Sequence, residues 1–169
     1  MRIFPATTIK EFSECEHGEF VQLRVRADTH SGLCIHEEGA KPEPKFLVLN
    51  SPDAKLIYKL IEPPQGDEVL AFGTNWTLSS YGEILRKHDA ANTSGAFIQT
   101  QKGQFIVAQE FEDFGDTLLC RLDQPGVVSN LSTANTGFAF PYWQIDYFDE
   151  TLSKLQKLAG NEPMSEDKG

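Results

Sequence analysis

Apolar residues recur along this chain in short runs, and the first long run alternates with polar residues. Over residues 20–26 apolar side chains fall on every second position, a period of two that is typical of a half-buried β-strand. One face of this strand is formed by Val21, Leu23 and Val25. The other face carries Gln22, Arg24 and Arg26, with Phe20 at its start. This part of the chain is therefore predicted to be a strand with one solvated face.

Similar runs elsewhere predict a mostly β protein. Further strands are expected over residues 33–36, 45–50, 68–74, 76–79, 81–87, 96–100, 104–109 and 116–122. The strands at 96–100 and 104–109 flank Gln101-Lys102-Gly103 and should form a hairpin. Residues 54–61 fit either a helix or a strand, and Pro63-Pro64 ends that segment in both cases.

Two segments have helical spacing instead. Thr8 and Glu11 stand three residues apart, as in a capping box, so a short helix is expected over residues 8–17, with Gly18 at its end. A second helix is expected from about residue 146 to residue 159, closed by Gly160. Its apolar face would consist of Phe148, Leu152, Leu155 and Ala159.

Three segments of the first ninety residues together resemble the oligonucleotide/oligosaccharide-binding fold, a small five-stranded Greek-key barrel. Ile9-Lys10-Glu11-Phe12 followed by residues 18–26 is similar to the entry segment and first strand of such barrels. Residues 46–49 are similar to the third strand, and residues 66–74 followed by 82–85 are similar to the closing hairpin. The resemblance implies a barrel over about residues 8–90 with a ligand-binding face.

The polar segment from His88 to Gly95 is the best internal boundary. We therefore expect the barrel over residues 1–92 and a flexible acidic tail over residues 161–169. Between them, residues 93–160 should form a hairpin, an aromatic segment and the C-terminal helix, packed on the barrel. A length of 169 residues fits one barrel with an extension better than two independent domains.

Composition excludes several classes of protein. Hydrophobic residues make up 40% of the chain and charged residues 24%, which supports a packed core rather than global disorder. The longest apolar runs have four or five residues, whereas a membrane-spanning helix needs about 20. No signal-peptide pattern follows Met1, and the three cysteines form no Cys-x-x-Cys pair. We therefore expect a soluble, cytoplasmic protein with reduced thiols and no membrane role.

The formal net charge of −10 argues against a protein that coats duplex nucleic acid, because phosphate binding needs a basic face. The charge is unevenly distributed, however. Ten of the fifteen Lys and Arg residues precede residue 93, so the larger acidic surplus lies in the second part of the chain. That part is the better candidate for contact with a basic partner.

Single-stranded nucleic acid is a separate possibility for the barrel face. Bases stack on aromatic rings while cations meet phosphates, so a mixed basic and aromatic face suits such a ligand. The candidate residues are Arg24, Arg26, Lys45, Trp76, Tyr81 and Lys87. The competing interpretation makes Arg24 and Arg26 ordinary solvated strand residues paired with glutamates.

The segment from residue 137 to residue 148 contains six aromatic residues. The favoured interpretation places them in the core, where they would pack the last strand and helix against the sheet. Alternatively, Tyr142 and Trp143 are exposed anchors for a protein partner, since such side chains are frequent binding hot spots. Pro141 beside them predicts an edge or an irregular segment.

A Cys-x-His pattern occurs twice, as Cys15-Glu16-His17 and Cys34-Ile35-His36. Two sulfurs and two nitrogens would suit a tetrahedral zinc site if both pairs converged. The spacing is not that of the usual zinc motifs, and the alternative is two buried cysteines with surface histidines. A cysteine hydrolase is the remaining alternative, with Cys34 and His36 or Cys120 and His88 as possible pairs.

The sequence therefore predicts a non-catalytic binding module without a cofactor. The leading hypothesis is a protein–protein contact, as in an adaptor, an inhibitor or an immunity-type protein. Binding of single-stranded nucleic acid is the first alternative. A cysteine- or histidine-dependent hydrolase or a metal-binding protein is the second.

Overall fold

The computed structural model describes residues 7–25, 27–39, 44–63, 66–85, 93–111, 115–129, 137–149 and 154–161. Within these ranges the chain forms two sheets and two short 3-10 helices, η1 (Phe12–Glu14) and η2 (Ala54–Leu56). None of the described helices is long and apolar enough to cross a membrane. The prediction of a mostly β protein is confirmed.

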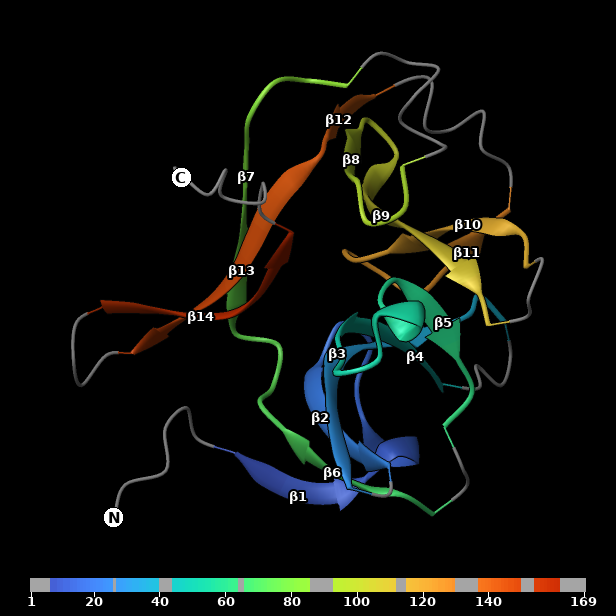
Figure 1. The fold of residues 1–169 in the computed structure, drawn as a ribbon, viewed down its shortest axis with the longest axis vertical. Helices are drawn as coiled ribbons and strands as arrows, with labels where there is room; N and C mark the ends of the chain where they lie inside the picture. Colours follow the sequence, from blue (N-terminus) through green and yellow to red (C-terminus); the bar gives the residue numbers. More distant parts are fainter. Residues whose placement is uncertain are drawn as a thin grey trace, which may run out of the picture.

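The larger sheet draws on most of the chain. Its strands are β1 (Thr8–Glu11), β2 (Phe20–Val25), β3 (Asp28–His36), β4 (Pro44–Asn50), β5 (Lys59–Ile61), β6 (Glu68–Ala71), β8 (Phe97–Thr100), β9 (Gly103–Glu110), β10 (Thr117–Arg121), β11 (Val127–Val128) and β12 (Phe138–Phe140). Their main order is β1-β6-β2-β3-β4-β5-β9-β10-β11, while β8 pairs with β9 and β12 pairs with β8 (Figure 1). β5 and β9 are parallel and the other described pairs are antiparallel.

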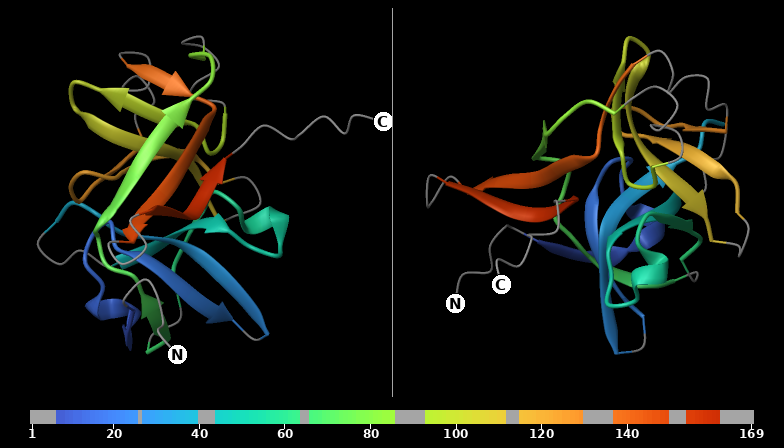
Figure 2. Two further views of the ribbon diagram at one scale, coloured as in Figure 1. Left: turned by 90° about the vertical axis from the view of Figure 1, so that its left-hand side faces the viewer. Right: turned by 45° about the horizontal axis from the view of Figure 1, so that its top comes forward.

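The smaller sheet has the order β14-β13-β7 and lies along one side of the larger sheet (Figure 2). It consists of β7 (Trp76–Tyr81), β13 (Tyr142–Asp149) and β14 (Lys154–Asn161). β12 and β13 belong to different sheets and are separated by Pro141 alone. Proline cannot donate a ladder hydrogen bond, so it suits the point where the chain changes sheets.

The continuous apolar runs are explained by strands that are buried on both faces. In β4, Phe46 and Val48 pack into one core cluster, while Leu47 and Leu49 point to the opposite face and pack into another. β9 shows the same division, because Ile106 and Ala108 join one cluster while Phe105 and Val107 join another. Alternation with polar residues is therefore seen at the solvated end of β2, where Arg24 is exposed, and is lost where both faces are covered.

One core cluster lies between the two sheets. Trp143, Ile145 and Ala159 of the smaller sheet pack there against side chains of the larger sheet, including Leu33 and Ile106. Because this cluster combines strands from early and late in the chain, the sheets stabilise each other through hydrophobic burial.

The predicted helix over residues 146–159 is wrong. β13 and β14 form an antiparallel hairpin there, with Ile145 opposite Ala159 and Gln144 opposite Gly160. Gly160 is needed for close packing and not for a helix cap, since an added Cβ would lie 2.7 Å from the Trp143 carbonyl oxygen. The helix-forming residues of β14 adopt a strand because pairing with the aromatic-rich β13 outweighs local propensity.

Two further predictions for the first half are also wrong. Residues 8–17 form β1 and η1 instead of a helix, because residues 8–11 pair with residues 68–71 of β6. The expected closing hairpin is not formed either: β6 pairs with β1 and β2, whereas β7 pairs with β13, and residues 82–85 are not a strand. The larger sheet accordingly ends at β1 and β11, and the described strands close no barrel.

The other predicted strands are found within a few residues of their expected positions, and the hairpin around residues 101–103 joins β8 to β9. Residues 54–61, which fitted two structures, form η2 followed by β5. Residues 86–92, at the expected boundary between 1–92 and 93–160, lie outside the described residues, but the larger sheet and its core use strands from both sides. Of the expected tail over 161–169, Asn161 alone is described, as the end of β14.

Replacement of Gly32 by alanine should destabilise the protein. Gly32 is buried in β3, and an added Cβ would lie 1.9 Å from the backbone oxygen of Leu47. We expect Gly32→Ala to lower the free energy of unfolding by about 1–3 kcal/mol or more, the usual cost of overpacking. Urea denaturation measures this change.

Gly39→Ala is the matched control, because an added Cβ at Gly39 meets nothing within 4 Å. It should leave the urea midpoint nearly unchanged. Equal midpoints for both variants would contradict the tight approach of β3 and β4 at Gly32.

Candidate functional site

The basic residues proposed for nucleic acid do not come together in the described structure. Arg24 on β2 lies opposite Thr29 of β3, and Lys45 on β4 lies opposite Ile35 of β3. Six residues of an extended strand separate Thr29 from Ile35, which is about 20 Å. Arg24 and Lys45 are thus at opposite ends of β3.

The remaining candidates are engaged within the fold or lie outside the described residues. The Lys45 ammonium lies 2.7 Å from a Glu37 carboxylate oxygen, and this hydrogen-bonded pair raises the pKa of Lys45. The Trp76 indole N–H donates to the Gly18 carbonyl oxygen at 2.8 Å. Arg26 and Lys87 lie outside the described residues, so nucleic-acid binding stays a prediction.

The two Cys-x-His segments do converge, as the metal hypothesis requires. The His36 backbone N–H donates to Nδ1 of His17 at 3.0 Å, and the two imidazole rings are 6.0 Å apart. Nε2 of His36 donates to the Cys15 carbonyl oxygen at 3.0 Å, and the Cys34 thiol approaches the same oxygen at 3.7 Å. The turn after η1 is thereby joined to the end of β3.

These contacts leave the cluster poorly suited to a metal. His17 and His36 each use one ring nitrogen to hold the backbone. Burial raises the pKa of Cys15 to about 11 and raises that of Cys34 further, whereas zinc binds the thiolate. Among the described residues, no three His, Cys, Asp or Glu side chains form a group that could hold a metal ion.

The same protonated thiols offer little support for a cysteine hydrolase. Cys34 is buried, and its thiol faces a carbonyl oxygen rather than an imidazole nitrogen. Burial raises the pKa of Cys120 to about 12, and His88 lies outside the described residues. A nucleophilic cysteine needs a lowered pKa, so neither thiol is activated by its surroundings.

Of the two aromatic anchors, Trp143 is not accessible. It is fully buried between the sheets, and its indole N–H donates to the Gly95 carbonyl oxygen at 2.6 Å. The prediction of Trp143 as a partner contact is therefore wrong, and its interpretation as a core residue is confirmed. Tyr142, the preceding residue, points to the other face of β13, as successive strand residues do.

Tyr142 is half-buried and stacks on exposed Tyr81, with ring centroids 6.1 Å apart. These two residues are register partners at the end of the β7–β13 pair. Tyr81, selected from the sequence as a platform for bases, thus lies beside Tyr142, selected as an anchor for a protein.

Two further apolar side chains are exposed on the chain segments that adjoin this aromatic pair, Ile84 after Tyr81 and Phe138 before Tyr142. Ile84 is 54% exposed and Phe138 is 62% exposed. Their chain neighbours are hydrogen bonded, since the Leu85 N–H donates to the Ala139 carbonyl oxygen at 2.8 Å, so both lie where residues 82–85 meet β12. We call the set Tyr81, Ile84, Phe138 and Tyr142 the apolar surface.

The sequence does not single out Ile84, and it places Phe138 in a segment expected to be mainly core. The alternation around buried Ala139 is the pattern that indicates the outward direction of Phe138. Ile84 follows Tyr81-Gly82-Glu83 in the sequence. No neighbouring residue indicates that Ile84 faces solvent while the next residue, Leu85, points inward.

Acidification should weaken the connection between the two Cys-x-His segments. Burial lowers the pKa of His17 below 6.5, helped by the neighbouring His36, against the opposing effect of Asp123. Below pH 6.5 the unfolded chain therefore binds a proton at His17 more readily than the folded chain does, so stability falls as pH decreases toward the folded pKa. Urea denaturation between pH 7.5 and pH 5 measures this fall.

His17→Asn is the informative variant, because its side-chain oxygen keeps an acceptor near the position of Nδ1 without a titrating group. The fall in stability between pH 6.5 and pH 5 should be smaller in this variant than in the wild type. Parallel curves for the two proteins would show that the pH dependence arises elsewhere.

The described structure thus offers one exposed apolar surface and a structural Cys–His cluster. Compared with known proteins, the chain matches no family model, no curated protein and no solved structure.

Proposed function

We propose that this protein is a non-catalytic binding module that holds another protein at the apolar surface. The observation that carries the proposal is the stacked pair of Tyr81 and Tyr142 at the end of the β7–β13 pair, with exposed Ile84 and Phe138 on the adjoining segments, which are joined by the Leu85–Ala139 backbone hydrogen bond. Contiguous exposed apolar patches on a folded protein commonly mark sites of interaction, whereas scattered apolar residues do not.

The tyrosine pair suits an interface. Tyr81 and Tyr142 already contact each other in the free protein, so little side-chain freedom is lost when a partner covers them. Tyrosine also combines a large apolar face with a hydroxyl, which is why it is frequent among binding hot spots. Ile84 and Phe138 would add purely apolar area beside it.

The charge of the chain favours a basic protein as the partner. A net charge of −10 attracts basic surfaces and repels nucleic acid at long range. Exposed Glu83 lies between Tyr81 and Ile84 in the chain, so a carboxylate borders the apolar surface. An adaptor or an inhibitor of a basic protein fits this combination, and the single-stranded nucleic-acid alternative has less support.

Polar substitutions on the apolar surface should weaken partner binding without affecting the fold. The test variant is Ile84→Ser with Phe138→Ser. Its control is Ile9→Ser with Phe111→Ser, which removes the same residue types at 69% and 61% exposure from other elements. Proteins retained from a lysate of the source cells by the immobilised wild-type chain are identified by mass spectrometry, and their affinities are measured with purified partner.

The test variant should bind such a partner at least tenfold more weakly than the wild type, whereas the control variant should bind it unchanged. Equal binding by wild type and test variant would refute the proposed surface. Self-association of the wild type that only the test variant loses would identify the partner as a second copy of this chain.

A further inference from the structure

Five of the described strands pair with a neighbour on one side only: β1, β7, β11, β12 and β14. The unpaired side of such an edge strand presents backbone N–H and C=O groups, which can pair with a strand of another chain. Proteins usually protect these edges by short length, charged side chains, bulges or covering segments. The described edges of this protein differ in that protection.

The three edge strands of the larger sheet are short, charged or covered. β1 has four residues and includes Lys10 and Glu11, β11 has two residues, and β12 has three. Residues 82–85 also contact the outer edge of β12, because the Leu85 N–H donates to the Ala139 carbonyl oxygen at 2.8 Å. None of these three strands offers a long ladder to another chain.

In the smaller sheet, β14 is protected by a charge and a bulge. Lys157 is exposed on this strand. Leu158 is the extra residue of the bulge, since Ile145 pairs with Ala159 and Asp146 pairs with Lys157. A bulge interrupts the ladder of hydrogen bonds and bends the strand, which disfavours the addition of another strand.

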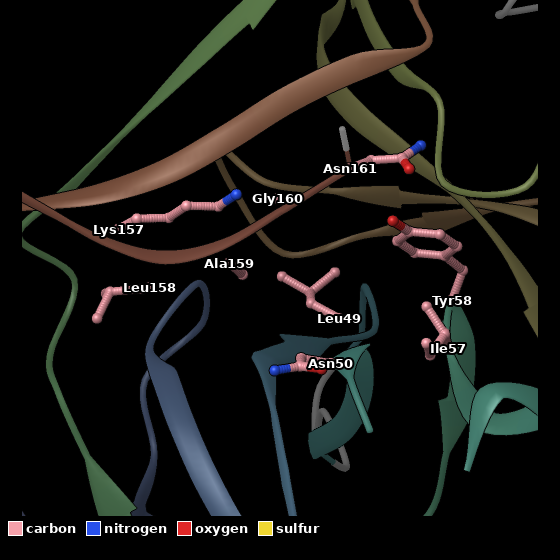
Figure 3. A pocket seen from close by; sticks show the side chains of 9 residues that line it. All are labelled: Leu49, Asn50, Ile57, Tyr58, Lys157, Leu158, Ala159, Gly160 and Asn161. Carbon is pink, nitrogen blue, oxygen red and sulfur yellow. The ribbon is translucent and has the colours of Figure 1, made fainter. Parts of the chain in front are cut away.

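The bulge of β14 lies at a pocket of about 550 Å³ between β14 and the end of β4 (Figure 3). Leu158 lines one wall. Leu49, on the facing wall, is the extra residue of a bulge in β4, at the register shift between Ser31 and Gly32 of β3. Tyr58 lines that wall too, with a left-handed φ of 60° that is costly for a residue other than glycine. The edge of β14 is therefore irregular where it passes the pocket.

β7 has none of these protections. It has six residues and contains no charged residue and no proline. Its register with β13 runs without a shift, from Trp76 opposite Tyr147 to Tyr81 opposite Tyr142. Figure 2 shows β7 and β14 at opposite edges of the smaller sheet, with β13 between them. β7 is therefore the longest regular edge among the described strands.

The core face of β7 is incompletely covered along this edge. Trp76 and Leu78 pack against the core between the sheets but are only partly buried. Ser80 is on the same face, because it lies opposite the buried Trp143, and it is exposed. Apolar side chains of an added strand would lie beside Trp76 and Leu78 and would extend the core.

The charge of the chain favours a basic segment at β7 over a second copy of this protein. β7 itself is uncharged, exposed Glu83 follows it by two residues, and the net charge is −10. Two copies would therefore repel each other at long range, whereas a basic segment would be attracted. The solvated face of β7, with exposed Thr77 and Ser79, suits polar neighbours.

We propose that β7 binds an extended segment of a basic partner protein as an additional antiparallel strand. Apolar side chains of the segment would alternate with polar or basic ones, and the apolar set would face Trp76 and Leu78. Backbone hydrogen bonds would supply affinity, and the alternating side chains would supply specificity. This inference rests on the proposed function, because it names how the partner is held: β7 ends at Tyr81, which belongs to the apolar surface.

The probe is the peptide Lys-Val-Thr-Val-Thr-Val-Lys with capped ends, which as a strand has its valines on one face. Titration of the full-length protein at low ionic strength is followed by amide chemical shifts. The peptide should shift the amides of residues 76–80. An analogue with glutamate in place of both lysines should bind about threefold more weakly or worse, because the acidic chain repels it.

Backbone methylation tests whether the peptide binds as a strand. Each residue of an antiparallel strand directs its N–H and C=O to one side, and its neighbours direct theirs to the other side. One analogue is N-methylated at the three valines and another at the two threonines. One of them should bind like the parent peptide, and the other should bind at least about tenfold more weakly.

Two neighbouring serines of β7 provide a test variant and its control. Ser80→Lys places a charge on the core face, which disfavours strand addition, and should weaken the parent peptide at least about tenfold. Ser79→Lys adds the same charge on the solvated face and should weaken it about threefold at most. Both serines are exposed, and amide shifts outside the smaller sheet should show that both variants keep the fold.

Several outcomes would overturn the inference. These are no binding of the parent peptide, shifts confined to residues outside β7, equal affinities of the two methylated analogues, or equal losses in the two serine variants. Dimerisation of the wild type that Ser80→Lys abolishes and Ser79→Lys retains would assign the edge to a second copy, and would overturn the choice of a basic partner.

Failure of this inference is distinguishable from failure of the proposed function. The peptide tests use the purified protein alone, so they can fail while partner binding still depends on Ile84 and Phe138. Conversely, Ile84→Ser with Phe138→Ser can leave partner binding unchanged while the peptide still pairs with β7. The first result would overturn strand addition, and the second would overturn the apolar surface.

Discussion

The arrangement of the two sheets depends on the burial of Trp143. Its indole hydrogen bond to Gly95 and its edge-to-face contact with Tyr58 join the smaller sheet to two separate parts of the larger sheet. Gly95 has to be glycine because the Tyr58 ring occupies the space of a side chain there. A large side chain that fills the core stabilises the contact between the sheets. When its one polar group is also hydrogen bonded, the orientation of that side chain is fixed as well. The wall of the pocket formed by Tyr58 follows from this contact.

The change of sheet at Pro141 has a second consequence for the surface. β12 pairs in the larger sheet and β13 pairs in the smaller one. Phe138 and Tyr142 therefore lie on opposite sides of Pro141, and neither is in the core. Tyr142 then meets Tyr81 at the end of β7, and residues 82–85 connect back toward β12. The exposed apolar side chains therefore adjoin the point where the chain passes from the larger sheet to the smaller one.

The position of most strands was predictable from the sequence, and the physical reason is local. Alternation in β2 and continuous apolar runs in β4 and β9 reflect how many faces of a strand are covered, and this pattern is readable without knowing the partner strands. The hairpin of β8 and β9 was predictable because its turn residues adjoin both strands. The pairing partners of the strands were not predictable from the sequence. The expected closing hairpin is not formed because β7 pairs with β13, a strand more than sixty residues away.

By itself, the sequence determined the β class, the acidic charge and the two Cys-x-His segments, because these depend on residue type and near neighbours. Only the tertiary structure decided that residues 154–161 form a strand, since pairing with β13 outweighs the helical preference of that segment. It also decided that Trp143 is buried while Phe138 is exposed, and that two bulges and a strained Tyr58 meet at one pocket. Such features depend on which distant residues pack together, and the local spacing of residues in the sequence does not determine those contacts.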